Sequence, residues 1–410
     1  DMAKKGVVLD LDTYWMPQKI TSGGKDERSE AWGNAIATLN MDTQKAGLWP
    51  GGFVKIQTVT SFGDSLLQDT GALVPANMTW LLPKPVDNAT GLQEFTYTQF
   101  LSHQFGVTLG KINGIAPTAE FFSDYTTQFQ NIGLNIPLVL ALVPLSAYGA
   151  TALYLPSHEV TLVGMVLDPN GTIDNDDLND AFDGGVMSLF FGDLKIKPYG
   201  LHGHQSVILA YSNKDRTSLV QNPANVGRLL AEARFPLLGD PGPILIEIFD
   251  KLGIPPTADP LNEKSDAWSA IYRFEQYLWQ PAGNPTGGIG MFFSAGVSDG
   301  KANPIKHAYS AGLAGKGVVP GRPRDDFGIG WVRTEFSDDF LPELSATFDL
   351  GLEHEDAVEI FYNAEVTPWL NITPNFQIIS PALNKTLDAN SDFEDLDTTY
   401  IVGLRVGIRF

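Results

Sequence analysis

The stretch Tyr400-Ile-Val-Gly-Leu-Arg-Val-Gly-Ile-Arg-Phe410 decides the fold class of this chain. Successive side chains of a β-strand point to opposite faces, so this stretch would present two different surfaces. One face is apolar throughout, and the other is mostly glycine and arginine: Tyr400, Val402, Leu404, Val406, Ile408 and Phe410 against Ile401, Gly403, Arg405, Gly407 and Arg409. Such a strand is typical of a membrane-spanning barrel, in which one face meets lipid, the other meets a wet lumen, and a terminal aromatic lies in the interfacial girdle.

The same alternation recurs upstream. Leu344–Leu350, Ala357–Val366 and Leu370–Ile378 repeat it clearly, and Trp268–Leu278 and Gly330–Phe336 repeat it more weakly. Further strands are predicted near residues 6–16, 35–42, 52–62, 92–102, 150–156, 160–168, 186–197, 203–212, 288–297 and 305–315. The total is roughly sixteen. Sixteen strands of about 10 residues leave about 250 positions for turns and loops, which suits the length of the chain.

Two stretches do not read as strands. Ala119–Ile132 places aromatic residues four apart, as one face of a helix would, and Asn225–Gly253 has helical composition interrupted by two prolines. We interpret both as long loops with short helices, near 113–135 and 215–265, that fold into the lumen; the alternative is a small separate domain. The sequence therefore predicts an all-β protein, a closed antiparallel transmembrane β-barrel forming a single domain over residues 1–410.

Composition excludes several classes of function. The net charge of −21, from 48 acidic and 27 basic residues, argues against a nucleic-acid partner. The absence of cysteine excludes disulfides, thiolate metal sites and cysteine nucleophiles. The most apolar long stretch, Ile136–Leu155, is interrupted by Pro137 and Pro144, so we expect no transmembrane helix. Asp1 suggests a mature, processed start without its signal peptide.

Catalytic and metal-binding patterns are weak. There is no nucleophile-elbow, phosphate-loop or paired-histidine zinc motif: in His354-Glu355, Val358 stands where the second histidine would be. His202 and His204 are interpreted as a surface or rim pair, and the acidic loop at 168–183 as solvated, with divalent-ion binding as the alternative. No cofactor and no metal site are predicted.

A set of short motifs resembles a known family. The set comprises Gly288-Ile-Gly-Met-Phe-Phe293, Ser298-Asp-Gly300, Asn303, Tyr309, Gly312-Leu313, Gly321-Arg-Pro323, Asp325, Gly328-Ile-Gly330, Glu359-Ile-Phe-Tyr362, Val366-Thr-Pro-Trp-Leu370, Pro374, Gln377 and Gly403-Leu-Arg405, with Gly23-Gly24 and Asp42–Gly52 upstream. It is similar to the carbohydrate-selective outer-membrane porins of the OprB type. The resemblance implies a sixteen-stranded barrel, passive diffusion of sugars such as glucose, and inward-folded loops that narrow the lumen. The segment Ser380–Lys385 departs from an Asn-Pro-Gly-Gly-like turn that is frequent in the family.

A sugar-selective lumen needs paired donors and acceptors with an aromatic surface, held weakly enough for release. From strand parity we expect Trp331 to stack on a sugar ring, with an interfacial girdle role as the alternative. Ordinary salt bridges are the alternative for the arginines. The predicted pore-lining residues are Arg273, Glu275, Trp331, Arg333, Glu335, Glu359, Asn363, Glu365, Asn371, Asn375, Gln377 and Arg405.

Two other functions stay open at this point: an outer-membrane barrel enzyme that uses carboxylates such as Glu335, Glu359 and Glu365, and a secreted soluble β-sandwich that binds carbohydrate. The predicted partners are permeating sugars and the lipid and lipopolysaccharide of the bacterial outer membrane, with a homotrimer or a monomer as the assembly. The sequence leaves open which sugars are preferred and which loops form the constriction.

Overall fold

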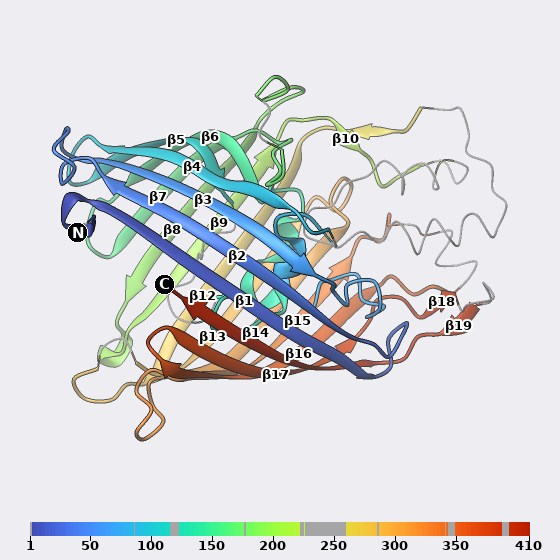
Figure 1. The fold of residues 1–410 in the computed structure, drawn as a ribbon. Coiled ribbons are helices and arrows are strands. Elements are labelled where there is room, and N and C mark those ends of the chain that lie inside the picture. The colour runs from blue at the N-terminus through green and yellow to red at the C-terminus, as the bar shows by residue number, and fades with distance from the viewer. Residues whose placement is uncertain are drawn as a thin grey trace.

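The computed structural model describes residues 2–85, 87–114, 122, 124–175, 178–221, 225, 260–284, 287–340, 342, 349–387 and 393–410. Sixteen antiparallel strands close into one barrel (Figure 1). They are β1 (Val7–Ser22), β2 (Ser29–Asp42), β3 (Gly52–Gly63), β4 (Thr90–Phe100), β5 (Phe105–Asn113), β6 (Ser146–Tyr154), β7 (Val160–Leu167), β8 (Met187–Ile196), β9 (Gly203–Ser212), β12 (Ala267–Trp279), β13 (Gly288–Ser298), β14 (Ile305–Lys316), β15 (Asp326–Phe336), β16 (His354–Thr367), β17 (Leu370–Ser380) and β20 (Thr399–Arg409).

The barrel closes where β1 pairs with β20, the C-terminal strand of alternating apolar residues. Their register places Trp15 opposite Val406 and Asp12 opposite Arg409. The predicted sixteen-stranded closed barrel is confirmed. One strand was missed, since β5 is interrupted by Gly106 and Gly110 and its alternation is weak. Most of the predicted strand Leu344–Leu350 lies outside the described residues.

Side-chain exposure follows the predicted alternation along β20. Val402 is 48% exposed, whereas Ile401, Gly403 and Arg405 are buried. The exposed parity of β16 and β15 also carries large apolar side chains, among them Ile360 and Ile329. The outside of the barrel is therefore a hydrophobic belt of the kind that meets lipid, and the inside holds the polar side chains.

The two ends of the barrel differ. At one end lie the N-terminal 3₁₀ turn η1 (Ala3–Lys5) and short connections such as 101–104 and 368–369. At the other end the connections are longer and carry two small two-stranded sheets, β10 (Arg216–Thr217) with β11 (Glu263–Lys264), and β18 (Lys385–Leu387) with β19 (Phe393–Asp395) (Figure 1). A further 3₁₀ turn, η4 (Pro198–Gly200), connects β8 and β9. Outer-membrane barrels have short turns on the periplasmic side and long loops outside, so the η1 end is the periplasmic end.

Two long connections fold inside the barrel. Residues 64–89 carry the 3₁₀ turn η2 (Met78–Leu81), and residues 114–145 carry α1 (Ile132–Asn135) and the 3₁₀ turn η3 (Leu138–Leu140). All of η2 and α1 is buried. We call the described residues of these two connections the plug.

The helices predicted from sequence are only partly seen. Residues 124–131 form turns rather than the predicted helix, and the helical turn begins at Ile132. Most of the second predicted helical segment, Asn225–Gly253, lies outside the described residues, so a single domain over residues 1–410 stays a prediction. No helix in the described part of the chain is long and apolar enough to cross a membrane.

Candidate functional site: the barrel lumen

The plug is attached to the barrel wall by buried charged side chains. The Glu359 carboxylate accepts hydrogen bonds from the backbone N–H groups of Gln130 (2.9 Å) and Asn131 (2.8 Å) and from Asn375 Nδ2 (3.0 Å). Glu359 itself has no exposed surface. A buried carboxylate is tolerated only when it is paired or hydrogen-bonded, and here the plug backbone provides most of the donors.

Arg405 has the complementary role on β20. Its guanidinium donates to the carbonyl oxygens of Tyr125 (2.7 Å) and Gln128 (2.8 Å), so it binds plug acceptors where Glu359 binds plug donors. Gln377 on β17 donates to the carbonyl of Ala76 at 2.8 Å. These predicted pore-lining residues face inward as expected, but their polar groups hold the constriction.

A second carboxylate fastens the other plug segment. Glu355 accepts from the backbone N–H groups of Leu73 (2.9 Å), Val74 (3.0 Å) and Ala382 (3.2 Å). It was not among the predicted lumen residues, although it shares the parity of Glu359 on β16. That shared parity was the signal in the sequence that could have identified it.

Opposite these polar anchors, the plug packs on the wall through apolar contacts. Phe129 lies edge-to-face with Phe361 (ring centroids 4.7 Å apart) and with Phe292 (5.5 Å). The wall glycines Gly328 and Gly330 leave space for the plug, because a Cβ at either position would lie within 3.1 Å of Phe129 ring atoms. The inner surface of this barrel is therefore apolar where Phe129 and its neighbours in the plug cover it.

That apolar inner surface explains a wrong prediction on β15. Trp331, Arg333 and Glu335 were expected to line the lumen, but they stand on the outward parity of the strand, where Trp331 is 37% exposed. The inward parity is Val332, Thr334 and Phe336. Val332 is buried against the plug, since a Cβ on Gly133 would meet its Cγ2 at 2.7 Å.

The outward group on β15 makes contacts of its own. Arg333 Nη2 lies 2.7 Å from Asp356 Oδ2, and Trp331 Nε1 donates to Asp356 Oδ1 at 2.9 Å. Glu335 lies 3.1 Å from His307 Nδ1. These contacts lie on the outward parity of β15, and that of Arg333 is a salt bridge, the alternative stated for the arginines.

The remaining predicted residues face the interior. Asn363 Oδ1 accepts from Asn371 Nδ2 (3.2 Å) and from Thr373 Oγ1 (2.8 Å). Arg273 and Glu275 are buried on β12. Glu365 pairs with Arg324 at 2.6 Å, beside the short connection that joins β14 to β15.

His204 is not the surface or rim residue that the sequence suggested. It is buried, with Nδ1 2.8 Å from Asp193 Oδ1 and Nε2 3.0 Å from Glu275 Oε2. His202 takes no part in the contacts of His204 with Asp193 and Glu275. Its backbone N–H donates to Gln280 Oε1. Within the described residues, no cluster of three histidine or acidic side chains is placed to hold a metal ion.

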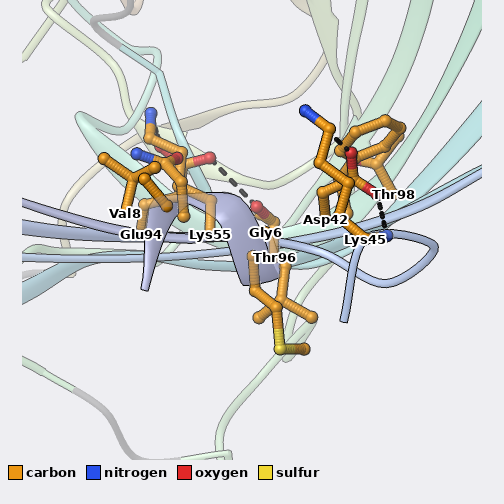
Figure 2. A pocket seen from close by; sticks show the side chains of 13 residues that line it. Gly6, Val8, Asp42, Lys45, Lys55, Glu94, Thr96 and Thr98 are labelled. Atoms are coloured by element: carbon orange, nitrogen blue, oxygen red, sulfur yellow. Dashed lines mark hydrogen bonds and ion pairs between the residues drawn. The ribbon is translucent and has the colours of Figure 1, made fainter. Parts of the chain in front are cut away.

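A recess of about 360 Å³ opens near the periplasmic end, on the wall formed by the N-terminal strands (Figure 2). Asn40, Lys55 and Glu94 contribute polar groups to it, and Phe53 contributes a ring. Phe53 is 42% exposed and lies edge-to-face with Phe100, with the ring centroids 6.0 Å apart. The recess thus combines hydrogen-bonding groups with a flat apolar surface.

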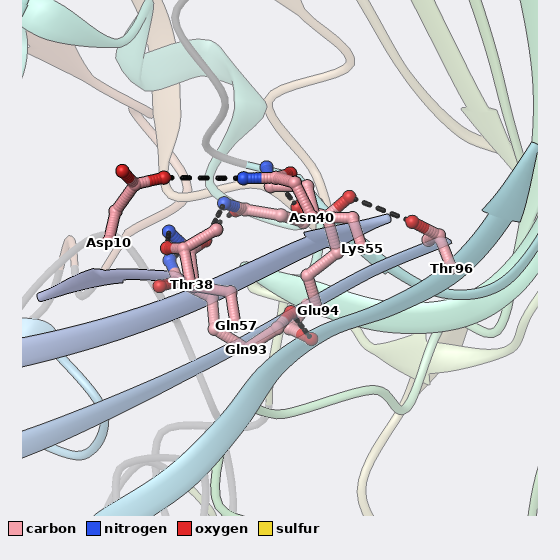
Figure 3. Close-up of polar contacts among 10 residues, drawn as sticks. Asp10, Thr38, Asn40, Lys55, Gln57, Gln93, Glu94 and Thr96 are labelled. Carbon is pink, nitrogen blue, oxygen red and sulfur yellow. Dashed lines mark hydrogen bonds and ion pairs between the residues drawn. The ribbon is translucent and has the colours of Figure 1, made fainter. Parts of the chain in front are cut away.

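Polar side chains continue from the recess along the inner face of β1–β5 (Figure 3). Lys55 Nζ lies 2.7 Å from Glu94 Oε2, and Thr96 Oγ1 donates to Glu94 Oε1 at 3.0 Å. The other contacts join amides, hydroxyls and one carboxylate: Asn40 to Asp10 (3.4 Å), Gln57 to Thr38 (3.0 Å), Asn113 to Gln57 (3.3 Å) and Gln93 to Asn113 (3.4 Å). We call these nine residues, Asp10, Thr38, Asn40, Lys55, Gln57, Gln93, Glu94, Thr96 and Asn113, the polar ladder.

Strand register explains why the polar ladder faces inward. Lys55 pairs with Asn40, and Gln57 with Thr38, on the parity that includes the buried Asn34. Asn34 Nδ2 donates to the plug carbonyl of Leu82, which fixes that parity as the inner one. These strands are predicted from the sequence, but the inward residues of the ladder are not; polar residues two apart, such as Lys55 and Gln57, are the signal that could identify them.

A sixteen-stranded barrel with an apolar outside, a polar inside and an inner constriction is the architecture of an outer-membrane porin. The family model described as "Carbohydrate-selective porin, OprB family" matches residues 31–410. The chain belongs to this family. It is therefore an outer-membrane β-barrel of a class of channels that are not enzymes, and neither the barrel enzyme nor the secreted soluble protein stands as an alternative.

Individual relatives are more distant. Porin B of Pseudomonas aeruginosa is 23% identical over 145 residues, a match that spans 32% of this chain and 30% of that relative. The high-pH structure of Pseudomonas putida OprB has 19% identity and a TM-score of 0.79, covering 100% of this chain and 95% of that one. The outer-membrane-expressed OmpT of Vibrio cholerae has 10% identity and a TM-score of 0.51, covering 98% and 97%. At these identities the structural matches establish the shared fold.

Proposed function

We propose that this porin carries passive diffusion of mono- and oligosaccharides, glucose among them, along the polar ladder on the inner face of β1–β5. The observation that supports it most directly is the pair of hydrogen-bonded groups on this face: one runs from Gln93 through Asn113 and Gln57 to Thr38, and the other joins Lys55 and Thr96 to Glu94 beside the recess. Sugar hydroxyls both donate and accept hydrogen bonds, and the ring faces of a sugar are apolar. Contacts of modest strength in series let a solute enter each position and leave it again.

In this proposal the predicted pore-lining residues divide into two roles. Glu359, Gln377 and Arg405 hold the plug against the wall, and Asn375 donates to Glu359, so that together they set the width of the passage. Arg273, Glu275, Asn363, Glu365 and Asn371 remain inner-wall candidates for contact with solute.

The test is solute entry into liposomes that contain the purified protein. Glucose should enter at a rate that falls for larger oligosaccharides, and Gln57→Leu should slow glucose because it removes the amide between Thr38 and Asn113. Thr58→Leu is the matched control, since Thr58 is the next residue on β3 and stands on the outward parity. Equal glucose rates for Gln57→Leu and the wild type would remove the polar ladder from the pathway.

A further inference from the structure

The carboxylates on this side of the lumen are not equivalent. Glu94 lies 2.7 Å from Lys55, Asp42 lies 3.5 Å from Lys45, and Asp12 stands opposite Arg409 in the register of β1 and β20. Each of these acids has a cationic neighbour that offsets its charge.

Asp10 differs from its neighbours. Its hydrogen-bond partner is the Asn40 side-chain amide at 3.4 Å, and no described cationic side chain lies within ion-pair distance of it. Asp10 is partly exposed on β1, beside the recess that Asn40 helps to line (Figure 3). Among the residues that the structure describes, Asp10 is therefore an acid of the pathway without an ion-pair partner.

We infer that Asp10 is a specificity-determining residue, and that the lumen favours cationic amino sugars, such as 2-amino-2-deoxyhexoses, over neutral hexoses and disfavours sugar acids. The inference rests on the proposed function. An ammonium group that passes the recess gains a partner in Asp10, whereas a sugar carboxylate meets repulsion from it. A unit charge pair about 4 Å apart in water is worth about 1 kcal/mol, so a rate difference of about fivefold is expected between amino sugar and neutral sugar.

The experiment measures entry of radiolabelled glucose, glucosamine and glucuronate into proteoliposomes at low ionic strength. The expected order of rates is glucosamine, then glucose, then glucuronate, with a difference that shrinks at about 1 M salt, where the screening length is about 3 Å. Asp10→Asn should bring the glucosamine-to-glucose and glucuronate-to-glucose rate ratios close to one, so the two ratios, and not the glucose rate itself, are the readout. Asp338→Asn is the control, because Asp338 pairs with exposed Lys306 at the far end of the barrel and the substitution changes net charge equally.

The outcomes separate this inference from the proposed function. If glucose enters but the three wild-type rates are equal, or if Asp10→Asn keeps the order, the role of Asp10 is overturned while the porin function stands. If no sugar enters, the proposed function itself fails. The salt dependence of the three rates in the wild-type protein gives a second readout. It does not require Asp10→Asn to fold.

Discussion

The Glu359 carboxylate on β16 accepts the backbone N–H of Asn131 in the plug at 2.8 Å, although 228 positions separate the two residues along the chain. The contact joins the barrel wall to the constriction. Glu359→Gln removes the negative charge and one of the two acceptor oxygens, so the donors of Gln130, Asn131 and Asn375 would share a single neutral oxygen. Hydrogen bonds to charged groups are worth about 1.5–3 kcal/mol. We expect a looser plug and a larger single-channel conductance in planar bilayers.

Glu335→Gln is the matched control for that measurement. Glu335 stands on the outward parity of β15 and pairs with His307, so its substitution should leave the conductance at the wild-type value. Identical conductance for Glu359→Gln and Glu335→Gln would show that Glu359 does not hold the constriction.

Arg405→Ala should also enlarge the passage, because it releases the carbonyl oxygens of Tyr125 and Gln128. Arg333→Ala should not, since Arg333 pairs with Asp356 on the outside of the barrel. The measurement is the ratio of small-ion conductance to glucose rate, which should rise for Arg405→Ala alone. A rise in that ratio for Arg333→Ala would return Arg333 to the lumen.

The lipid-facing and lumen-facing sides of the strands should differ in how much stability the barrel loses when a charged residue is introduced. Ile360 is 48% exposed on the outward parity of β16, so Ile360→Arg should lower the free energy of unfolding by about 2–4 kcal/mol if it lies near the bilayer midplane. Asn40→Arg places the same side chain in the wet lumen and should cost much less. Urea unfolding in lipid vesicles compares the two variants, and equal losses would contradict the assignment of faces.

Asp325, in the connection between β14 and β15, predicts a pH dependence of stability. Burial alone would raise its pKa, but hydrogen bonds from Arg322 Nε (2.7 Å), the Tyr362 hydroxyl and the Glu365 backbone N–H (3.1 Å) together lower the pKa below its usual value. A carboxyl group with a lowered folded-state pKa contributes stability above its unfolded pKa of about 4 and loses that contribution as the pH falls through the folded value.

Asp325→Asn should therefore destabilise the barrel at pH 7 by about 1 kcal/mol, a figure reduced for the exposure of Arg322. The difference in unfolding free energy between Asp325→Asn and the wild type should become smaller below about pH 4. Unfolding free energies measured at both pH values check this. If the difference in unfolding free energy between Asp325→Asn and the wild type widened as the pH fell, the lowered pKa of Asp325 would be contradicted.

Much of the fold was predictable from period-two alternation alone. On β12, β16, β17 and β20 the inward parity assigned from sequence agrees with the burial pattern, because polar residues there alternate with lipid-facing apolar ones. On β15 the rule failed, since Val332 faces the plug and Phe336 stacks on Phe340 inside the barrel. A lumen filled by its own loops has an apolar inner surface in places, and no local pattern on β15 reveals which loop will cover it.

The functional assignment of individual residues was less predictable for the same reason. Parity correctly put Glu359 and Arg405 inside, but whether an inward charge meets water or plug backbone depends on connections far away in sequence. The polar ladder lies on strands whose alternation is weaker.

The most direct test uses the absence of cysteine from the chain. Two single-cysteine variants are compared: Gln57→Cys in the polar ladder and Gln377→Cys behind the plug. The rate at which each cysteine reacts with a membrane-impermeant thiol reagent reports whether that position is in contact with the aqueous pathway. We predict rapid modification at position 57 that glucose slows, and little modification at position 377. Rapid, glucose-protected modification at position 377, with none at position 57, would contradict the proposed pathway.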